Sequence, residues 1–169
     1  TDEYLTPEQQ SVRDAAFVEY RRSQQELAER PESHVNLGNV YAERRQTQKA
    51  IEEYQTASRL DPLFVPAYVH LADLYRSLSQ EERSAAVLAE GLKQVSGNGA
   101  LLYFSGLQRI RVGDMRAALS FLRRAKSAAP REGQYADSDS LALDAAGQLD
   151  EAIPTVAEAL RFSQCSPQL

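Results

Sequence analysis

The chain has 169 residues, of which 43% are hydrophobic and 25% are charged, a balance typical of a folded protein and not of a disordered one. Its formal net charge of −5 argues against a nucleic-acid-binding protein, which normally presents a basic face. No apolar run approaches the roughly 18 residues that a transmembrane helix needs, so no membrane contact is expected. The single cysteine, Cys165, cannot form an intrachain disulfide.

The first predicted element is a long helix that begins after Thr6. Thr6 can cap the helix, Pro7 suits its first turn, and Gln9 stands where a capping box requires it. We expect the helix to run to about Arg30, because the residue before Pro31 is disfavoured in a helix. We interpret it as a cap, or as the surviving second helix of a degenerate repeat. Its apolar residues recur at helical spacing: Val12, Ala16, Phe17, Tyr20 and Leu27.

Two amphipathic segments follow within residues 31–64, separated by a polar turn at 45–47, and this pattern recurs every 34 residues. Small residues recur where two helices would have to approach closely, and large ones recur where the space between helices must be filled. A single copy cannot bury its own apolar face, so successive copies must stack. In the first copy the recurring residues are Leu37, Gly38, Tyr41, Ala50, Tyr54, Ala57 and Pro62.

This pattern resembles the tetratricopeptide repeat family, whose signature has leucine, glycine, tyrosine, alanine, an aromatic residue, alanine and proline at these places. The first copy departs at His34, which takes a place usually held by tryptophan. The resemblance implies an all-α fold, a right-handed α-solenoid of about four antiparallel helix pairs after the N-terminal helix. The predicted division is a lead-in and capping helix at 1–30, repeat units at 31–64, 65–98, 99–132 and 133–166 (together 31–166), and a tail at 167–169.

The fourth unit departs most from the pattern. Asp139 falls where a buried leucine is expected, and Pro154 lies near the first turn of the last helix. The spacing of Asp137, Asp139 and Asp144 does not match a calcium loop, so we predict no metal site and favour a terminal unit with a polar outer face. The helices of the four units are predicted at about 32–45, 48–60, 65–78, 82–94, 99–112, 115–128, 136–146 and 149–163.

No catalytic site is predicted. His34 and His70 lie in neighbouring units, and neither has a cysteine or a HExxH arrangement nearby. Cys165 lies in the C-terminal tail without a local sign of activation. No glycine-rich phosphate loop is present. We therefore expect no enzymatic reaction, no cofactor and no nucleotide.

The resemblance places the functional surface in a groove lined by the first helix of each unit. In our interpretation the amides of Asn36 and Asn39 fix a peptide backbone, and four apolar side chains of the third unit form an anchor pocket. The candidate partner-binding residues are Asn36, Asn39, Val69, His70, Asp73, Arg76, Tyr103, Phe104, Leu107, Ile110 and Arg111.

The charges at the groove positions predict the chemistry of the ligand, and the apolar patch of the third unit allows alternatives to ligand binding. Five acidic side chains against two basic ones at groove positions favour a neutral or basic segment of a protein or peptide. The apolar patch Tyr103–Ile110 can instead pack against the fourth unit, the N-terminal helix or a second copy of the chain. The sequence therefore predicts a protein- or peptide-binding scaffold. The alternative is a structural module that self-associates into a homo-oligomer, or a spacer within a larger chain.

Overall fold

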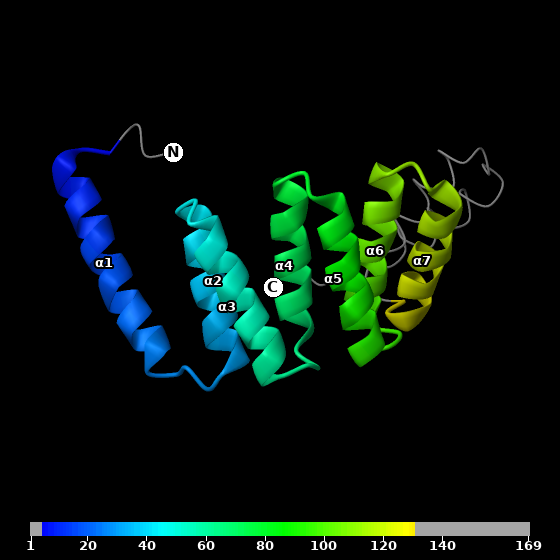
Figure 1. The fold of residues 1–169 in the computed structure, drawn as a ribbon, viewed down its shortest axis with the longest axis horizontal. Coiled ribbons are helices and arrows are strands. Elements are labelled where there is room, and N and C mark those ends of the chain that lie inside the picture. Colours follow the sequence, from blue (N-terminus) through cyan, green and yellow to red (C-terminus); the bar gives the residue numbers. More distant parts are fainter. Residues whose placement is uncertain (1–4, 131–169) are drawn as a thin grey trace, which may run out of the picture. The chain divides into compact units, whose positions relative to one another are not determined.

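The computed structural model describes residues 5–130, and every regular element within them is an α-helix (Figure 1). The prediction of an all-α helical repeat is confirmed for this part of the chain. The predicted fourth unit with its three aspartates, the predicted helices 136–146 and 149–163, and Cys165 lie outside the described residues. The helices are α1 (Pro7–Gln25), α2 (Pro31–Glu43), α3 (Thr47–Leu60), α4 (Val65–Ser77), α5 (Glu81–Gln94), α6 (Gly99–Arg111) and α7 (Met115–Ala128).

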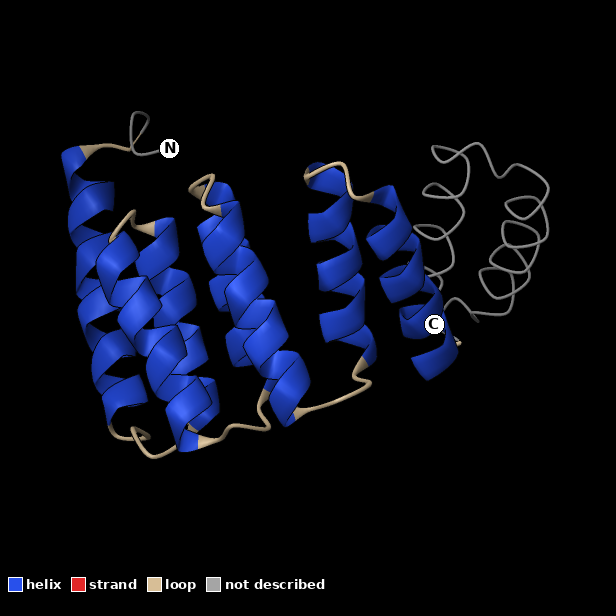
Figure 2. Cartoon of the chain, turned by 45° about the vertical axis from the view of Figure 1, so that its right-hand side comes forward, coloured by secondary structure: helices blue, strands red, loops and turns tan. Residues whose placement is uncertain are grey.

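The chain divides into two compact units, Thr1–Ala67 and Tyr68–Leu169, which we call the N-terminal and C-terminal units. The N-terminal unit contains α1 and the hairpin of α2 and α3. The C-terminal unit contains most of α4, then α5, then the hairpin of α6 and α7. Short loops join successive helices throughout the described chain (Figure 2).

The helices of the repeats recur with the predicted period. First helices begin at Pro31, Val65 and Gly99, which are 34 residues apart, and the second helices keep the same spacing. The predicted bounds of these six helices agree with the observed ones to within two residues. The conformation of the turn after each first helix also recurs. One residue in each of these turns is left-handed, with φ of 57° to 78°. These turn residues are Arg45, Ser79 and Gly113.

Glycine sets the closeness of the helices within the α2–α3 and α6–α7 hairpins. A Cβ atom on Gly38 would lie 2.6 Å from Cδ1 of Tyr54, and one on Gly106 would lie 2.7 Å from Cγ of Leu122. Contacts this short are not tolerated, so any larger residue would push the helices apart. The small residues of the second helices are fully buried in the first and third repeats: Ala50, Ala57, Ala118 and Ala125. These contacts confirm the predicted pairing of small and large residues.

In the second repeat, α5 packs between the two first helices of the C-terminal unit. A Cβ atom on Gly91 would lie 2.9 Å from Tyr68 of α4 and 3.0 Å from Leu101 of α6. The buried hydroxyl of Ser84 donates a 2.9 Å hydrogen bond to the carbonyl of Ala72 on α4. A small residue and a satisfied hydroxyl together allow the same close approach that glycine and alanine allow in the other hairpins.

The start of α1 agrees with the prediction, but its end does not. The Thr6 hydroxyl accepts a hydrogen bond from the Gln9 backbone, and the Gln9 side chain accepts one from the Thr6 backbone, which completes the capping box. The helix ends at Gln25 and not near Arg30. Tighter turns replace it, including a 2.9 Å bond from the Arg30 backbone N–H to the carbonyl of Leu27. Helix α1 contains no buried residue.

His34 links the α1–α2 connection to α3. Its Nε2 atom lies 2.8 Å from the carbonyl oxygen of Ala28, and its Nδ1 atom lies 2.6 Å from Oε2 of Glu53. Both partners are hydrogen-bond acceptors, so His34 makes both bonds as a donor only when both ring nitrogens carry protons. The residue that departs from the family pattern is therefore tied into the hairpin by polar contacts.

Candidate functional site

Two asparagines on α2 are the candidate residues of the N-terminal unit. Asn36 is exposed and Asn39 is half-buried. The hydroxyl of Tyr54 donates a 2.7 Å hydrogen bond to Oδ1 of Asn39. This bond fixes the orientation of the Asn39 side chain, so the group it can offer to a ligand is its amide nitrogen, a donor.

Helix α4 carries the four candidates of the second repeat. Val69 and His70 are half-buried, whereas Asp73 and Arg76 are exposed and form an ion pair with an N–O distance of 2.7 Å. The hydrogen bond from Arg76 to Asp73 raises the pKa of the guanidinium, which therefore stays charged. Such an exposed pair contributes about 0–1 kcal/mol, so a charged ligand can compete for either member.

Burial sets the charge of His70. It lowers the pKa of the imidazole from its usual 6.5, and the nearby carboxylate of Asp73 offsets only part of this effect. His70 is consequently neutral at pH 7. A neutral imidazole carries one N–H donor and one acceptor nitrogen.

The apolar candidates on α6 have two different surroundings. Tyr103 and Ile110 pack against the buried leucines of α7, so part of their surface belongs to the α6–α7 hairpin. Phe104 and Leu107 are half-buried. The ring of Phe104 meets that of Tyr103 edge to face, with centroids 5.4 Å apart. The structure thus brings Tyr103 and Phe104 into contact, and Tyr103 connects the candidate surface to the core.

Arg111, at the end of α6, bridges to α5. Its Nε atom lies 3.1 Å from Oε1 of Glu81, the first residue of α5. Sequence inspection did not select Glu81, because its distance of 30 residues along the chain gives no local signal. The pair balances the charge of Arg111 and joins the two helices at their ends.

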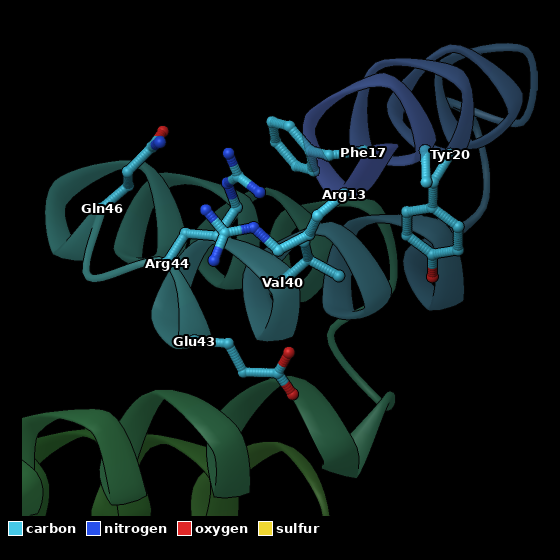
Figure 3. Close-up of a pocket in the computed structure, with 8 residues that line it drawn as sticks. Arg13, Phe17, Tyr20, Val40, Glu43, Arg44 and Gln46 are labelled. Atoms are coloured by element: carbon cyan, nitrogen blue, oxygen red, sulfur yellow. The ribbon is translucent and has the colours of Figure 1, made fainter. Parts of the chain in front are cut away.

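A cavity that none of the candidate residues lines opens between α1 and α2 of the N-terminal unit (Figure 3). We call it the α1–α2 cleft. Its volume is about 470 Å³, and its lining mixes aromatic, aliphatic and charged side chains. Clefts of about 300–1,000 Å³ are the usual size for binding sites. The lining residues are Arg13, Ala16, Phe17, Tyr20, Val40, Glu43, Arg44 and Gln46.

One cluster holds α1 against α2 beside this cleft. The guanidinium of Arg44 lies 4.3 Å above the centre of the Phe17 ring and 2.5 Å from the carboxylate of Asp14. Phe17 in turn meets Tyr41 edge to face, with centroids 5.8 Å apart. The hydrogen bond from Arg44 also lowers the pKa of Asp14. Arg44 and Phe17 therefore both attach α1 to α2.

Residues 5–130 contain neither a cluster of metal-binding side chains nor a helix that could span a membrane. No group of three or more histidine, cysteine, aspartate or glutamate side chains there is placed to hold a metal ion. In the same residues, no helix has both the length and the apolar character needed to cross a membrane.

Comparison with known proteins identifies the repeat. A sequence profile of the family described as Tetratricopeptide repeat matches residues 31–64. No curated protein matches the chain significantly by sequence.

Solved structures resemble the chain in fold. The crystal structure of MamA has a TM-score of 0.72 at 19% identity, covering 95% of this chain and 96% of that one. YrrB, described as "a TPR protein with an unusual peptide-binding site", has a TM-score of 0.65 at 21% identity, covering 85% and 74%. The Cut9–Hcn1 hetero-tetramer of APC/C has a TM-score of 0.68 at 14% identity, covering 88% and 30%. The resemblance to tetratricopeptide repeat proteins is thus confirmed in sequence for the first repeat and in fold for the chain.

Proposed function

We propose that this chain, a tetratricopeptide repeat protein by its match at residues 31–64 and by its fold, is a scaffold that binds a protein or peptide through the first helices of its repeats. The observation that best supports the proposal is that one face of α4 is buried while polar side chains on the same helix are exposed. Leu71 and Tyr75 are buried, whereas Asp73 and Arg76 stay exposed on the same helix. Polar groups that the hairpin does not use are available to a partner.

The contacts suggest the chemistry of the ligand. Half-buried Phe104 and Leu107 suit an apolar anchor side chain, and the amide nitrogen of Asn39 suits a backbone carbonyl. Glu32 and Glu43 are exposed on α2, and carboxylates attract a basic segment. We therefore infer a peptide segment with an apolar residue flanked by neutral or basic ones.

The comparisons support an interaction role and suggest no reaction. YrrB is described as having a peptide-binding site, and Cut9–Hcn1 is described as a hetero-tetramer. Both resemble this chain in fold at low sequence identity, so the similarity does not specify the ligand of this chain. We infer that the chain assembles proteins and catalyses no reaction, in keeping with repeats whose residues chiefly specify packing.

Selection from a displayed peptide library, followed by hydrogen exchange of the complex, tests this proposal. We expect the selected peptide to slow amide exchange in the first helices α2, α4 and α6, where the candidate residues lie. Protection confined to the second helices α3, α5 and α7 would contradict the proposed surface.

Sedimentation over a range of concentrations tests the alternative of self-association. A binding scaffold with an accessible Phe104 is expected to remain a monomer, and Phe104→Glu should leave its sedimentation unchanged. A tight dimer that dissociates in Phe104→Glu would favour a self-associating module in place of the scaffold.

A further inference from the structure

The charge of the third repeat is opposite in sign to that of the whole chain. The chain has a net charge of −5, yet residues 99–130 contain six basic residues and one acidic residue. That acidic residue, Asp114, caps α7 by accepting a hydrogen bond from the backbone N–H of Ala117. Helix α7 itself contains no acidic residue, so no carboxylate of the helix balances its four basic side chains: Arg116, Arg123, Arg124 and Lys126.

The three arginines of α7 lie on one exposed face of the helix. Arg116, Arg123 and Arg124 are exposed, and so are the two small serines between and beyond them. Spacings of three, four and seven residues place all five side chains on the same face. Arg116 and Arg123 are about 10 Å apart along the helix axis. We call this face the α7 stripe, which consists of Arg116, Ser120, Arg123, Arg124 and Ser127.

The repeat frame indicates that the α7 stripe stays exposed when another repeat follows. Helix α5 is followed by α6, and each residue of α5 that lies 34 positions before a stripe residue is exposed: Glu82, Ala86, Ala89, Glu90 and Lys93. The buried side of α5 includes Gly91, where an added Cβ atom would lie 3.0 Å from Leu101 of α6. Ala125 of α7 takes the place of Gly91 and is also buried. A following helix therefore meets a side of α7 other than the stripe.

The corresponding faces of the other second helices have mixed charge. The face of α3 has one glutamate and one arginine, and on the face of α5 Glu90 pairs with Lys93 at 3.0 Å. By contrast, no ion pair within residues 5–130 involves Arg116 or Arg124. Arg124 contacts the ring of Phe121, 5.8 Å from its centre, on its own helix. These two guanidinium groups can therefore pair with carboxylates of another molecule.

We propose that the α7 stripe binds an acidic segment of a partner protein, whose glutamate or aspartate carboxylates pair with Arg116 and Arg124. Guanidinium groups bind carboxylates through parallel N–H donors, and opposite charge steers the two surfaces together. The stripe lies on a second helix and contains none of the candidate residues of the first helices. The proposal therefore adds a second interaction site with the opposite charge preference, and it does not rest on the proposed function.

Two other anionic partners fit the observations less well. A membrane-binding helix pairs its basic face with exposed large apolar side chains, and α7 exposes none. A nucleic acid would be repelled by the net charge of −5 that the whole chain carries. An acidic protein segment needs neither exposed apolar groups nor a basic chain, so the observations favour it.

A synthetic acidic peptide tests the proposal. The probe is a fluorescent, alanine-based helical peptide with glutamates along one face, and the control is the same peptide with glutamines in their places. We expect the glutamate peptide to bind the full chain, with an affinity that falls as the salt concentration rises, and the glutamine peptide not to bind. Fluorescence anisotropy measures both.

Charge reversal locates the site. The double variant Arg116→Glu with Arg124→Glu should weaken the glutamate peptide at least tenfold. The matched control, Arg59→Glu with Lys93→Glu, changes the net charge by the same amount at exposed positions of α3 and α5 and should leave the affinity within about twofold. Glutamate at position 116 falls in the first turn of α7, where a negative charge is favourable, so the variant should still fold.

Three outcomes would overturn the proposal. Equal weakening by the two double variants would mean that the peptide responds only to net charge. Failure of the glutamate peptide to bind, with a lower melting midpoint for the Arg116 and Arg124 variant, would mean that carboxylates of this chain occupy the stripe. Binding of vesicles that contain phosphatidylserine, but not of the peptide, would assign the stripe to a membrane.

The first-helix surface is tested separately in the same variants. A peptide selected on the first helices should bind the Arg116 and Arg124 double variant as tightly as it binds the wild type, because neither arginine lies on a first helix. Failure of the α7 stripe to bind an acidic segment is therefore distinguishable from failure of the proposed function.

Discussion

Tyr54 of α3 lies against Gly38 of α2, and the Tyr54 hydroxyl donates a 2.7 Å hydrogen bond to the neighbouring Asn39. The absence of a side chain at Gly38 admits the ring, and the ring then orients the amide of Asn39. One tyrosine of the repeat pattern therefore fixes the hairpin and also positions a candidate binding residue.

Replacing Tyr54 with phenylalanine separates these two roles. The ring and its packing over Gly38 remain, but the bond to Asn39 is lost. We expect Tyr54→Phe to lower the free energy of unfolding by about 0.5–1.5 kcal/mol, as measured in urea. Tyr41→Phe, in the same hairpin, leaves the Asn39 bond in place and serves as the control. Equal peptide affinity of the wild type and Tyr54→Phe would show that the orientation of Asn39 does not matter for binding.

The frame of the third repeat is tested at Gly106. A leucine there would meet the side chain of Leu122, which the glycine now approaches closely. We expect Gly106→Leu to destabilise the protein by about 1–3 kcal/mol or more through overpacking. Ala89→Leu, at an exposed position of α5, should have little effect on the thermal midpoint. A midpoint unchanged by Gly106→Leu would mean that the repeat frame assigned to α6 is wrong.

The attachment of α1 is predicted to depend on Arg44. Arg44→Ala removes both the contact above Phe17 and the ion pair with Asp14, and α1 has no buried residue to compensate. Amide exchange in α1 should therefore become faster while exchange in α3 stays the same. Arg45→Ala, one residue further along in the turn, is the matched control. Equal effects of the two substitutions would contradict the assigned role of Arg44.

Burial of His70 predicts a pH dependence of stability. Because burial lowers the pKa of His70 in the folded chain, the unfolded chain takes up more protons as the pH falls below about 6.5. The unfolding free energy should therefore fall between about pH 7.5 and pH 5.5, and His70→Asn should lose less stability over this range. Denaturation of both proteins in urea measures the difference. Parallel curves would show that His70 makes no contribution.

The helices could be predicted from sequence because their signals are local. Within residues 5–130, the Thr6 cap and the 34-residue recurrence of small and large residues predicted all but one boundary of α1–α7 to within two residues. The end of α1 was wrong because residues 26–29 contain neither glycine nor proline, and their turns depend on bonds that His34 helps to make. Periodicity does not report a contact of that kind.

The candidate site depended on contacts that periodicity does not specify. The packing of Tyr103 on α7 and the pairing of Arg111 with Glu81 join residues on different helices. The α1–α2 cleft did have a sequence signal, because Ala16 and Tyr20 stand in the repeat frame 34 residues before Ala50 and Tyr54. The repeat frame alone does not predict the cleft, because the exposure of Tyr20 depends on how the helices pack.

The most direct test of the scaffold proposal is the dissociation constant of a selected peptide for matched charge variants. Asp73→Asn and Glu90→Gln each remove one exposed carboxylate that pairs with a cation on its own helix, but Asp73 lies on a first helix and Glu90 on a second. We predict that Asp73→Asn combined with Asn39→Ala weakens the peptide at least tenfold, about 1.4 kcal/mol, and that Glu90→Gln leaves its affinity unchanged. Unchanged affinity in the double variant would contradict the placement of the binding site on the first helices.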